Sequence, residues 1–275
     1  MNGITYQAVS RAKKTEYVVG DVVQLDIINS KQAQILDLLP RTNLVYRTDN
    51  NRSKLIASNI DQILIIIAVK PNFNIQFLNN CLIFAEYSDI PPVIIINKSD
   101  LSESANFIVE IKTLYQDKLK YPVIELSALS DCHEIHALLQ HKRSLLIGQS
   151  GVGKSTITNQ IIPTANTRTA ALAVSENSGC HTTTNAALYP IGTDASLVDC
   201  PGMQEFGLYD IPPERLHEYF PEFRALIGQC KFTNCRHLSE PGCAVTAAYA
   251  AGQIDKTRYF ALQNLTEKLL HKPRN

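Results

Sequence analysis

The spacing of apolar and polar residues changes along this chain, and its middle part has the clearest pattern. From about residue 61 to residue 205, short continuous apolar runs alternate with amphipathic stretches, which is typical of parallel strands covered by helices on both faces. The expected strands are Ile63–Val69, Pro92–Ile96, Pro122–Leu126, Ser144–Ile147 and Ser196–Asp199. Apolar residues three or four positions apart predict helices over residues 75–85, 104–118, 131–140 and 154–162. We therefore predict a doubly wound α/β domain, a fold that binds ligands at the carboxyl ends of its strands.

The two ends of the chain have different patterns. The first part contains short β-rich pieces without helical periodicity, which indicates a small barrel or meander; the pieces are Thr5–Ser10, Tyr17–Leu25 and Ala33–Leu39. Residues 47–54 are polar and aperiodic, so we expect a linker or loop there. Beyond about residue 206 the pattern is mostly helical around a cysteine-rich loop. The expected domains are residues 1–58, residues 59–207 and residues 208–275.

The composition indicates a globular protein that does not cross a membrane. Hydrophobic residues make up 45% of the chain and charged residues 19%. The longest apolar run, Ile63–Val69, is far shorter than the roughly 20 residues that a membrane span needs. The N-terminal residues have no basic segment leading into an apolar one, so we expect no secretory signal and a cytoplasmic location. In a reducing compartment the seven cysteines are expected as thiols or metal ligands.

The net charge is zero, which argues against bulk attraction to nucleic acid. Basic residues exceed acidic ones by eight to five in residues 1–60 and by nine to seven in residues 206–275, whereas residues 61–205 carry nine basic and fourteen acidic ones. The basic flanks are only weak evidence for an anionic partner, because most such imbalances simply solvate a surface.

A glycine-rich sequence, Gly148-Gln149-Ser150-Gly151-Val152-Gly153-Lys154-Ser155, follows one expected strand and precedes an expected helix. This is the context of a phosphate-binding loop. The glycines let backbone N–H groups surround phosphates at a helix N-terminus. Lys154 would neutralise the terminal phosphates, and the Ser155 hydroxyl would bind Mg²⁺. The motif predicts a bound nucleoside triphosphate.

The sequence Asn97-Lys98-Ser99-Asp100, directly after another expected strand, indicates which base is bound. The Asp100 carboxylate can accept hydrogen bonds from N1 and from the 2-amino group of guanine, and adenine offers neither donor. Asn97 is expected to brace the loop, and the Lys98 stem to lie over the ring. A further loop, Glu125-Leu126-Ser127-Ala128, resembles the backbone loop that contacts the guanine oxygen. Together these loops favour GTP over ATP.

Two further segments supply groups for the γ-phosphate and for Mg²⁺. Asp199-Cys200-Pro201-Gly202 follows an apolar strand and places an aspartate toward Mg²⁺ and the Gly202 N–H toward the γ-phosphate. Thr182-Thr183-Thr184 lies in a polar stretch that fits a mobile loop, in which one threonine reaches Mg²⁺ only while the γ-phosphate is present. We assign Thr183 to this role, although little separates it from its two neighbours.

The residue that orients the attacking water is not the usual one. Met203 follows the Asp-x-x-Gly motif, where many GTPases have a glutamine for this purpose. Methionine cannot orient water. His181, just before the threonines, is the best local candidate, and Gln204 is a weaker one.

The order of these motifs is also unusual. An ordinary GTPase runs phosphate loop, threonine, Asp-x-x-Gly, Asn-Lys-x-Asp and Ser-Ala. This chain starts with Asn97–Asp100 and Ser127–Ala128 and continues with the phosphate loop, the threonines and Asp199–Gly202. The cyclic order is kept and only the ends have moved, which indicates a circularly permuted GTPase. The second switch then leads directly into the C-terminal domain, so it could transmit the nucleotide state mechanically.

Four candidate metal ligands lie within fourteen residues, in a C-x4-C-x-H-x5-C arrangement: Cys230, Cys235, His237 and Cys243. Thiolate and imidazole ligands in a closed tetrahedral set are typical of structural zinc. Cys81, in contrast, falls on the apolar side of its expected helix and is predicted to lie in the core.

With these motifs in place, the chain resembles the ribosome small subunit-dependent GTPase A (RsgA/YjeQ) family. The resemblance rests on Val18–Val22, Asn97–Asp100, Gly148–Thr156, His181–Thr184, Asp199–Gly202 with Glu205–Gly207, and the four candidate zinc ligands. It implies an OB-like RNA-binding domain, a permuted GTPase domain and a helical zinc domain. It further implies a cytoplasmic GTPase of late small-subunit maturation that binds ribosomal RNA, with Thr156 at the nucleotide and His181 as the catalytic residue. Because few residues precede Val18–Val22, we expect the OB-like domain to be shortened.

The motifs leave one other function open and disfavour a third. The chain could be a nucleotide-gated RNA-binding module, in which GTP holds a shape and hydrolysis is incidental. A P-loop kinase is disfavoured by the guanine motif and by the lack of an evident domain for an acceptor substrate. We expect the GTPase, acting as a monomer with GTP, Mg²⁺, one Zn²⁺ and the small ribosomal subunit.

Overall fold

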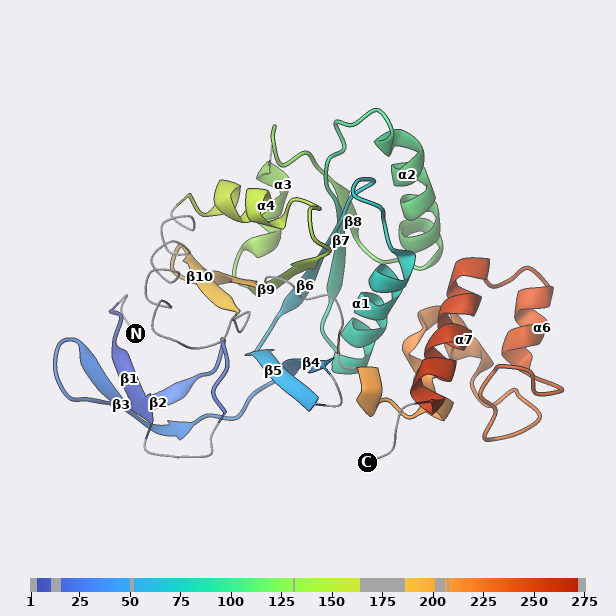
Figure 1. Cartoon of the computed structure of the whole chain (residues 1–275), viewed down its shortest axis with the longest axis horizontal. Helices are drawn as coiled ribbons and strands as arrows, with labels where there is room; N and C mark the ends of the chain where they lie inside the picture. Colours follow the sequence, from blue (N-terminus) through green and yellow to red (C-terminus); the bar gives the residue numbers. More distant parts are fainter. Residues whose placement is uncertain are drawn as a thin grey trace.

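A six-stranded sheet forms the centre of this computed structural model (Figure 1). The structure describes residues 4–10, 16–49, 52–130, 132–163, 186–200, 206 and 208–271. The strands are β6 (Gln62–Ile67), β7 (Pro92–Ile96), β8 (Val123–Glu125), β9 (Arg143–Gly148), β10 (Ala187–Ile191) and β11 (Ala195–Asp199). Their order in the sheet is β10-β11-β9-β6-β7-β8, and only β10 runs antiparallel to its neighbour. The five strands expected from the apolar runs are thus confirmed.

Helices cover both faces of this sheet, as a doubly wound fold requires. They are α1 (Ile75–Ser88), α2 (Ser104–Ile111) with its π-helical continuation η1 (Lys112–Lys118), α3 (His133–Leu139) and α4 (Lys154–Ile161). β6 is buried on both faces: Ile63 and Ile65 pack into the core that contains α1, whereas Leu64 and Ile66 pack into the core that contains α3 and α4. Cys81 of α1 is fully buried, as expected.

The strand β10 was missed by the sequence pattern. It lies at the edge of the sheet and contains Pro190, which cannot donate a hydrogen bond to a ladder. Only Tyr189 in this strand is buried. Because one face is open, β10 lacks the continuous apolar run that identifies the central strands.

The N-terminal part contains two small sheets. β1 (Gln7–Ser10), β3 (Gln32–Leu38) and β2 (Val23–Ile27) form one sheet in that order, with β1 parallel to β3. β4 (Leu44–Asp49) and β5 (Arg52–Ser58) form an antiparallel hairpin. The expected linker or loop over residues 47–54 is therefore wrong for residues 47–49 and 52–54, which belong to β4 and β5. The base of the hairpin is fixed by Val45 and Ala57, which are both fully buried in the core.

The turn around Gly20 joins this part to the central six-stranded sheet. The carboxylate of Asp21 accepts hydrogen bonds from Arg41 (2.7 and 2.8 Å), from the Ser58 hydroxyl (2.6 Å) and from the Val18 N–H (2.8 Å). Gly20 has φ +95°, and a Cβ there would lie 2.2 Å from the Ser58 carbonyl oxygen. Arg143, at the start of β9, donates to the Gly20 carbonyl at 2.7 Å. Glycine is thus required where the two parts meet.

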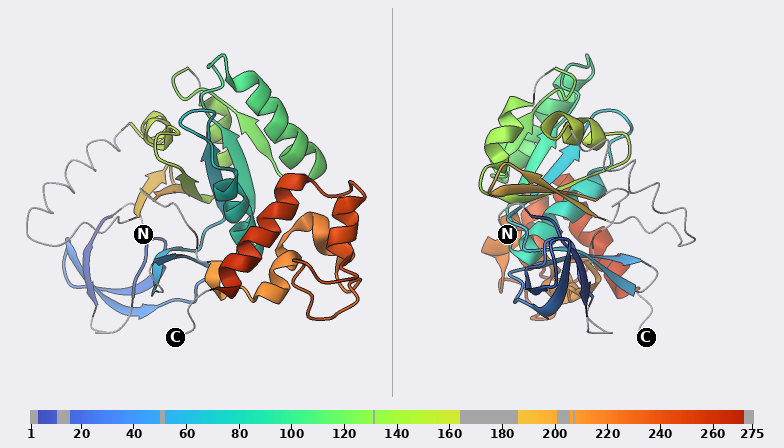
Figure 2. Two further views of the ribbon diagram at one scale, coloured as in Figure 1. Left: turned by 45° about the vertical axis from the view of Figure 1, so that its right-hand side comes forward. Right: turned by 90° about the vertical axis from the view of Figure 1, so that its left-hand side faces the viewer.

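The C-terminal part is mostly helical, as expected, and packs beside α1 (Figure 2). It contains three 3₁₀ helices, η2 (Leu208–Asp210), η3 (Pro213–Tyr219) and η4 (Pro221–Leu226), followed by α6 (Ala244–Ala250) and α7 (Lys256–Leu270). Both α7 and η3 contact α1. Within the described residues, no helix is long and apolar enough to cross a bilayer. The domain boundaries near residues 58 and 207 stay predictions.

Candidate functional site

Loops that leave the carboxyl ends of neighbouring strands meet at one edge of the central sheet. The expected site residues in these loops are Asn97–Asp100 after β7, Ser127 and Ala128 after β8, Gly148–Thr156 from the end of β9 into α4, and Asp199 at the end of β11. The strand order therefore brings together motifs that the sequence separates. His181, Thr183, Gly202 and Met203 lie outside the described residues.

The side chain of Asn97 connects three of these loops. Its Nδ2 donates to the carbonyl oxygen of Val152 in the glycine-rich loop at 2.8 Å. Its Oδ1 accepts from the N–H of Ala128 at 3.0 Å. The side chain is almost completely buried, with 2% of its surface exposed. Asn97 thus braces the loops, as expected, and does so through both ends of one amide.

The glycines of the glycine-rich loop allow the close contact with Asn97. Gly153 has φ +100°, and a Cβ there would lie 2.2 Å from the Asn97 Nδ2. At Gly148, a Cβ would lie 2.5 Å from the carbonyl oxygen of Ile66 in the neighbouring strand. Neither position has room for a side chain, so the loop depends on glycine for packing as well as for conformation.

Lys98 extends from the Asn97 loop across the glycine-rich loop. Its backbone has φ +62°. Its Nζ donates to the carbonyl oxygens of Gly151 (2.8 Å) and Lys70 (3.0 Å). The Ser104 hydroxyl, at the start of α2, donates to the Lys98 carbonyl at 2.7 Å. These bonds at its tip hold the aliphatic stem of Lys98 against the glycine-rich loop, where the stem can form one wall of a base-binding site.

Lys154 and Asp199 are two partly buried residues of opposite charge that interact at this edge of the sheet. The Lys154 Nζ donates to the carbonyl oxygens of Gly148 (2.6 Å) and Gln149 (2.8 Å). Burial lowers the pKa of Lys154 and raises the pKa of Asp199, and the attraction between the two opposite charges partly counteracts both shifts. The Asp199 Oδ1 is buried and has no hydrogen-bond partner among the described residues. A buried carboxylate oxygen of this kind is suited to a cation or to its bound water.

A cavity of about 260 Å³ lies beside the Asn97 loop. Its lining residues are Ser99, Asp100, Glu125, Leu126, Ser127, Ser130, His133 and Glu134. Asp100 and Ser127 were expected here. Ser130, His133 and Glu134 were not, because only the three-dimensional path of the chain from β8 into α3 places them next to Asp100. The groups predicted to read guanine therefore share a polar cavity.

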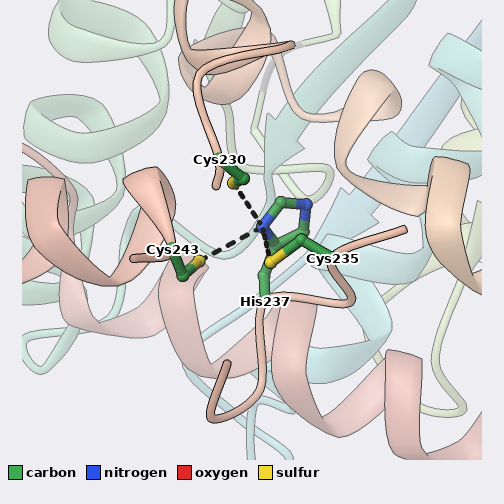
Figure 3. Close-up of side chains that lie close together, drawn as sticks. All are labelled: Cys230, Cys235, His237 and Cys243. Carbon is green, nitrogen blue, oxygen red and sulfur yellow. Dashed lines mark hydrogen bonds between the residues drawn. The ribbon is translucent and has the colours of Figure 1, made fainter. Parts of the chain in front are cut away.

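A second site, in the C-terminal part, brings together Cys230, Cys235, His237 and Cys243 (Figure 3). The possible ligand atoms all lie within 4.8 Å of one another. The His237 Nδ1 faces all three sulfur atoms, at 3.6 Å from Cys230 and Cys235 and 3.3 Å from Cys243. The cluster could hold a metal ion, as the spacing in the sequence predicts.

The backbone around this cluster supports it. The Ala244 N–H donates to the Cys230 sulfur at 3.3 Å, and the Thr246 N–H donates to the Cys243 sulfur at 3.4 Å. Burial raises the pKa of Cys235 to about 12, and burial with the nearby His217 lowers the pKa of His237 to about 4. A neutral imidazole is ready to bind a metal, whereas the thiols would release protons on binding, which makes metal affinity dependent on pH.

Comparisons with known proteins agree with this geometry. The family model described as RsgA GTPase matches residues 38–209. The chain belongs to the RsgA GTPase family. A small ribosomal subunit biogenesis GTPase RsgA of Neisseria gonorrhoeae is 42% identical over 98% of this chain and 87% of its own length. One of the same name from Burkholderia pseudomallei is 41% identical over 97% of this chain and 86% of its own length.

Two solved structures are similar to this RsgA family member along almost its whole length. The crystal structure of YjeQ from Thermotoga maritima has a TM-score of 0.76 and 28% identity, and covers 97% of this chain and 90% of its own. The structure of YloQ, a circularly permuted GTPase, has a TM-score of 0.71 and 28% identity, and covers 98% of this chain and 88% of its own. With the motif order along the chain, these matches confirm a circularly permuted GTPase.

The contacts of Asn97 predict the effect of its removal. Asn97→Ala leaves the Val152 carbonyl and the Ala128 N–H without partners, at a cost of about 1–3 kcal/mol each. If the bound nucleotide requires the braced loops, its affinity falls by roughly 30-fold or more. Titration calorimetry with GDP measures this loss. Asn106→Ala, at an exposed position of α2, is the matched control. Equal GDP affinities of the two variants would contradict the bracing role.

Proposed function

We propose that this protein hydrolyses GTP to GDP and phosphate during late maturation of the small ribosomal subunit, and that binding of the subunit stimulates hydrolysis. The single observation that best supports GTP binding is the Asn97 side chain, which holds the predicted base loops and the phosphate loop together. The names of the relatives support the ribosomal role. The proposal includes binding to ribosomal RNA, action as a monomer and a cytoplasmic location.

In this proposal, Asp100 selects guanine and the loop Gly148–Thr156 binds the phosphates. Asp100 and Ser127 line one polar cavity, which is consistent with a base that is read by Asp100 and by the backbone after Ser127. The N–H groups at the start of α4 face the phosphates, where the helix dipole favours negative charge. Lys154 is already held over the loop by two carbonyl oxygens, so it needs little reorganisation to neutralise a phosphate.

Ser155, Thr183 and the carboxylate of Asp199 are the proposed partners of Mg²⁺ or of its water shell. The buried Asp199 Oδ1, without a hydrogen-bond partner among the described residues, fits this role. When bound, Mg²⁺ would neutralise charge that develops on the β- and γ-phosphates. The N–H of Gly202 is proposed to contact the γ-phosphate.

We assign the orientation of the attacking water to His181. Met203 cannot donate or accept a hydrogen bond to water in the way that a glutamine does. His181 stands next to the threonines that are expected to order around the γ-phosphate. Correct placement of this one imidazole by the ribosomal subunit would raise a slow basal rate.

We further propose that the Cys230, Cys235, His237 and Cys243 cluster holds one structural zinc ion. A tetrahedral zinc ion, with Zn–S of about 2.3 Å and Zn–N of about 2.0 Å, sets its nitrogen and sulfur ligands about 3.5 Å apart. The distances of 3.3–3.6 Å from the His237 Nδ1 to the three sulfurs fit this geometry. Four protein ligands leave no position for a substrate, which is why the role is structural rather than catalytic.

The zinc assignment predicts one zinc per chain in freshly purified protein, measured by elemental analysis. Cys235→Ala should lose the metal and unfold the C-terminal part, because the cluster is the centre of its irregular loops, while GDP binding is largely retained. Cys81→Ala is the matched control, since Cys81 is a buried cysteine outside the cluster, and it should keep its zinc. Parent protein without metal would refute the assignment.

The function is tested by GTP turnover with and without purified small ribosomal subunits. The parent should be slow alone and strongly stimulated by subunits. His181→Ala should keep its GTP affinity and subunit binding but lose about 10²- to 10⁴-fold of the stimulated rate, the usual contribution of one well-placed acid, base or orienting group. His141→Ala, at an exposed histidine paired with Asp194, serves as the control.

Three outcomes of this turnover experiment separate the alternatives. Stimulation of the parent and loss in His181→Ala support the enzyme and the assignment of His181. Equal stimulation of His181→Ala and the parent would remove His181 and leave Gln204 or a ribosomal group. Subunit binding that depends on GTP but gives no turnover would instead identify a nucleotide-gated RNA-binding module.

A further inference from the structure

The helix α1 touches the phosphate loop at its start. The side chain of Asn74 caps the helix by accepting hydrogen bonds from the Gln76 N–H (2.9 Å) and the Phe77 N–H (3.3 Å). The backbone N–H of the same Asn74 donates to the Oε1 of Gln149 at 3.1 Å. Gln149 is the second residue of the glycine-rich loop. A displacement of this loop would therefore act directly on the first turn of α1.

The middle of α1 holds the C-terminal part through a buried polar network. The Asn79 Oδ1 accepts from the Tyr115 hydroxyl at 2.8 Å and from the Arg258 Nη1 of α7 at 3.0 Å. Arg258 is completely buried and pairs with Glu222 of η4, with its Nε 2.5 Å and its Nη2 3.3 Å from the two carboxylate oxygens. The guanidinium also lies over the Phe220 ring, 4.5 Å from the centroid.

The same helix α7 reaches the cysteine and histidine cluster. The Nε2 of Gln263 donates to the carbonyl oxygens of His237 (3.3 Å) and Leu238 (3.1 Å), and to the Tyr259 hydroxyl (2.9 Å). The residue that meets α1 and the residue that holds the cluster loop are thus five positions apart on one helix. Hydrogen bonds and the helices α1 and α7 thus connect the phosphate loop to the cysteine and histidine cluster without a gap.

A second contact reaches α1 from Phe206, which follows the Asp199–Gly202 segment by four residues. Phe206 stacks on Phe84 of α1, with centroids 4.3 Å apart and an interplanar angle of 18°. Both rings are buried. The phosphate loop and the chain that follows the second switch motif therefore both act on the helix that carries Asn79.

A buried ion pair is a poor device for stability alone, because desolvation of the two charges offsets most of their attraction, and an apolar pair of the same size often serves as well. We infer that this pair instead fixes the position of α7 relative to its neighbours. The planar guanidinium of Arg258 reaches Glu222 within its own domain and Asn79 across the interface at the same time. Together the two contacts constrain the orientation of α7 on α1.

We propose that Asn79 and Arg258 are positioning residues that couple the nucleotide state of the phosphate loop to the orientation of the metal-cluster domain on α1. The coupling itself needs only nucleotide binding. Its use in subunit-stimulated hydrolysis rests on the function proposed above.

The direct test is hydrogen exchange of residues 221–226 and 256–270 in the complexes with GDP and with a non-hydrolysable GTP analogue. The parent should show a difference between the two nucleotides in these segments. Arg258→Lys should lose most of that difference, because a single ammonium keeps the charge opposite Glu222 but cannot also reach Asn79. Arg215→Lys, which changes an exposed arginine paired with Glu218 in the same domain, should keep it.

Each result decides the proposal. The coupling would be overturned if the parent showed no difference in exchange between the two nucleotides. It would also be overturned if Arg258→Lys kept the difference that the parent shows. If Arg258→Lys fails to fold, Asn79→Ala removes the contact between Asn79 and Arg258 by changing the other partner. The same exchange measurement then applies, with the same expected loss of the difference between nucleotides.

A second measurement, GTP turnover with small subunits, separates this inference from the proposed function. Arg258→Lys should reduce the stimulated rate about tenfold, a typical size for coupling between sites, with less than about a twofold change in basal rate and GTP affinity. If the parent is not stimulated, the ribosomal function fails, and the exchange experiment still decides the coupling.

Discussion

The buried amide of Asn97 joins loops that arrive from different strands at one edge of the sheet. One amide can donate to Val152 and accept from Ala128 only if the glycine-rich loop comes within contact distance of the Asn97 loop. That approach is possible because position 153 has no side chain. This one contact holds together the loops that carry Asp100, Lys98 and the N–H groups proposed to bind phosphates, so the proposed nucleotide site depends on it.

The rest of the molecule is attached around the same edge through α1 and β9. Arg143 at the start of β9 holds the turn at Gly20 in the N-terminal part, and the phosphate loop leaves the other end of this strand. On the opposite side, α1 starts at the phosphate loop and carries Asn79 to Arg258. The permuted order of the motifs places the exit of the second switch on this helix as well. Both flanking parts are therefore held by elements that end or begin at the proposed nucleotide site.

Local patterns predicted the central strands and the motifs, because buried parallel strands are continuous apolar runs and the motif residues act within a few positions of one another. Patterns could not reveal β10, whose Pro190 and open face hide its strand character. They also missed the pairing of β4 with β5, because residues 47–49 and 52–54 are all polar. They also could not reveal the pairing of Asn79 with Arg258, which lie 179 residues apart and have no local signal. Such contacts exist only once the domains have packed.

The central claim is that Asp100 reads a guanine base in a site built by the braced loops. Competition binding of GDP and xanthosine diphosphate to the parent and to Asp100→Asn tests it most directly. The new amide can donate to the 2-oxo group of xanthine, so the account predicts that the parent prefers GDP and that the variant shifts its preference toward xanthosine diphosphate, by a factor that can reach about 10⁴. An unchanged preference in the variant would contradict the assignment of this edge of the sheet as a guanine nucleotide site.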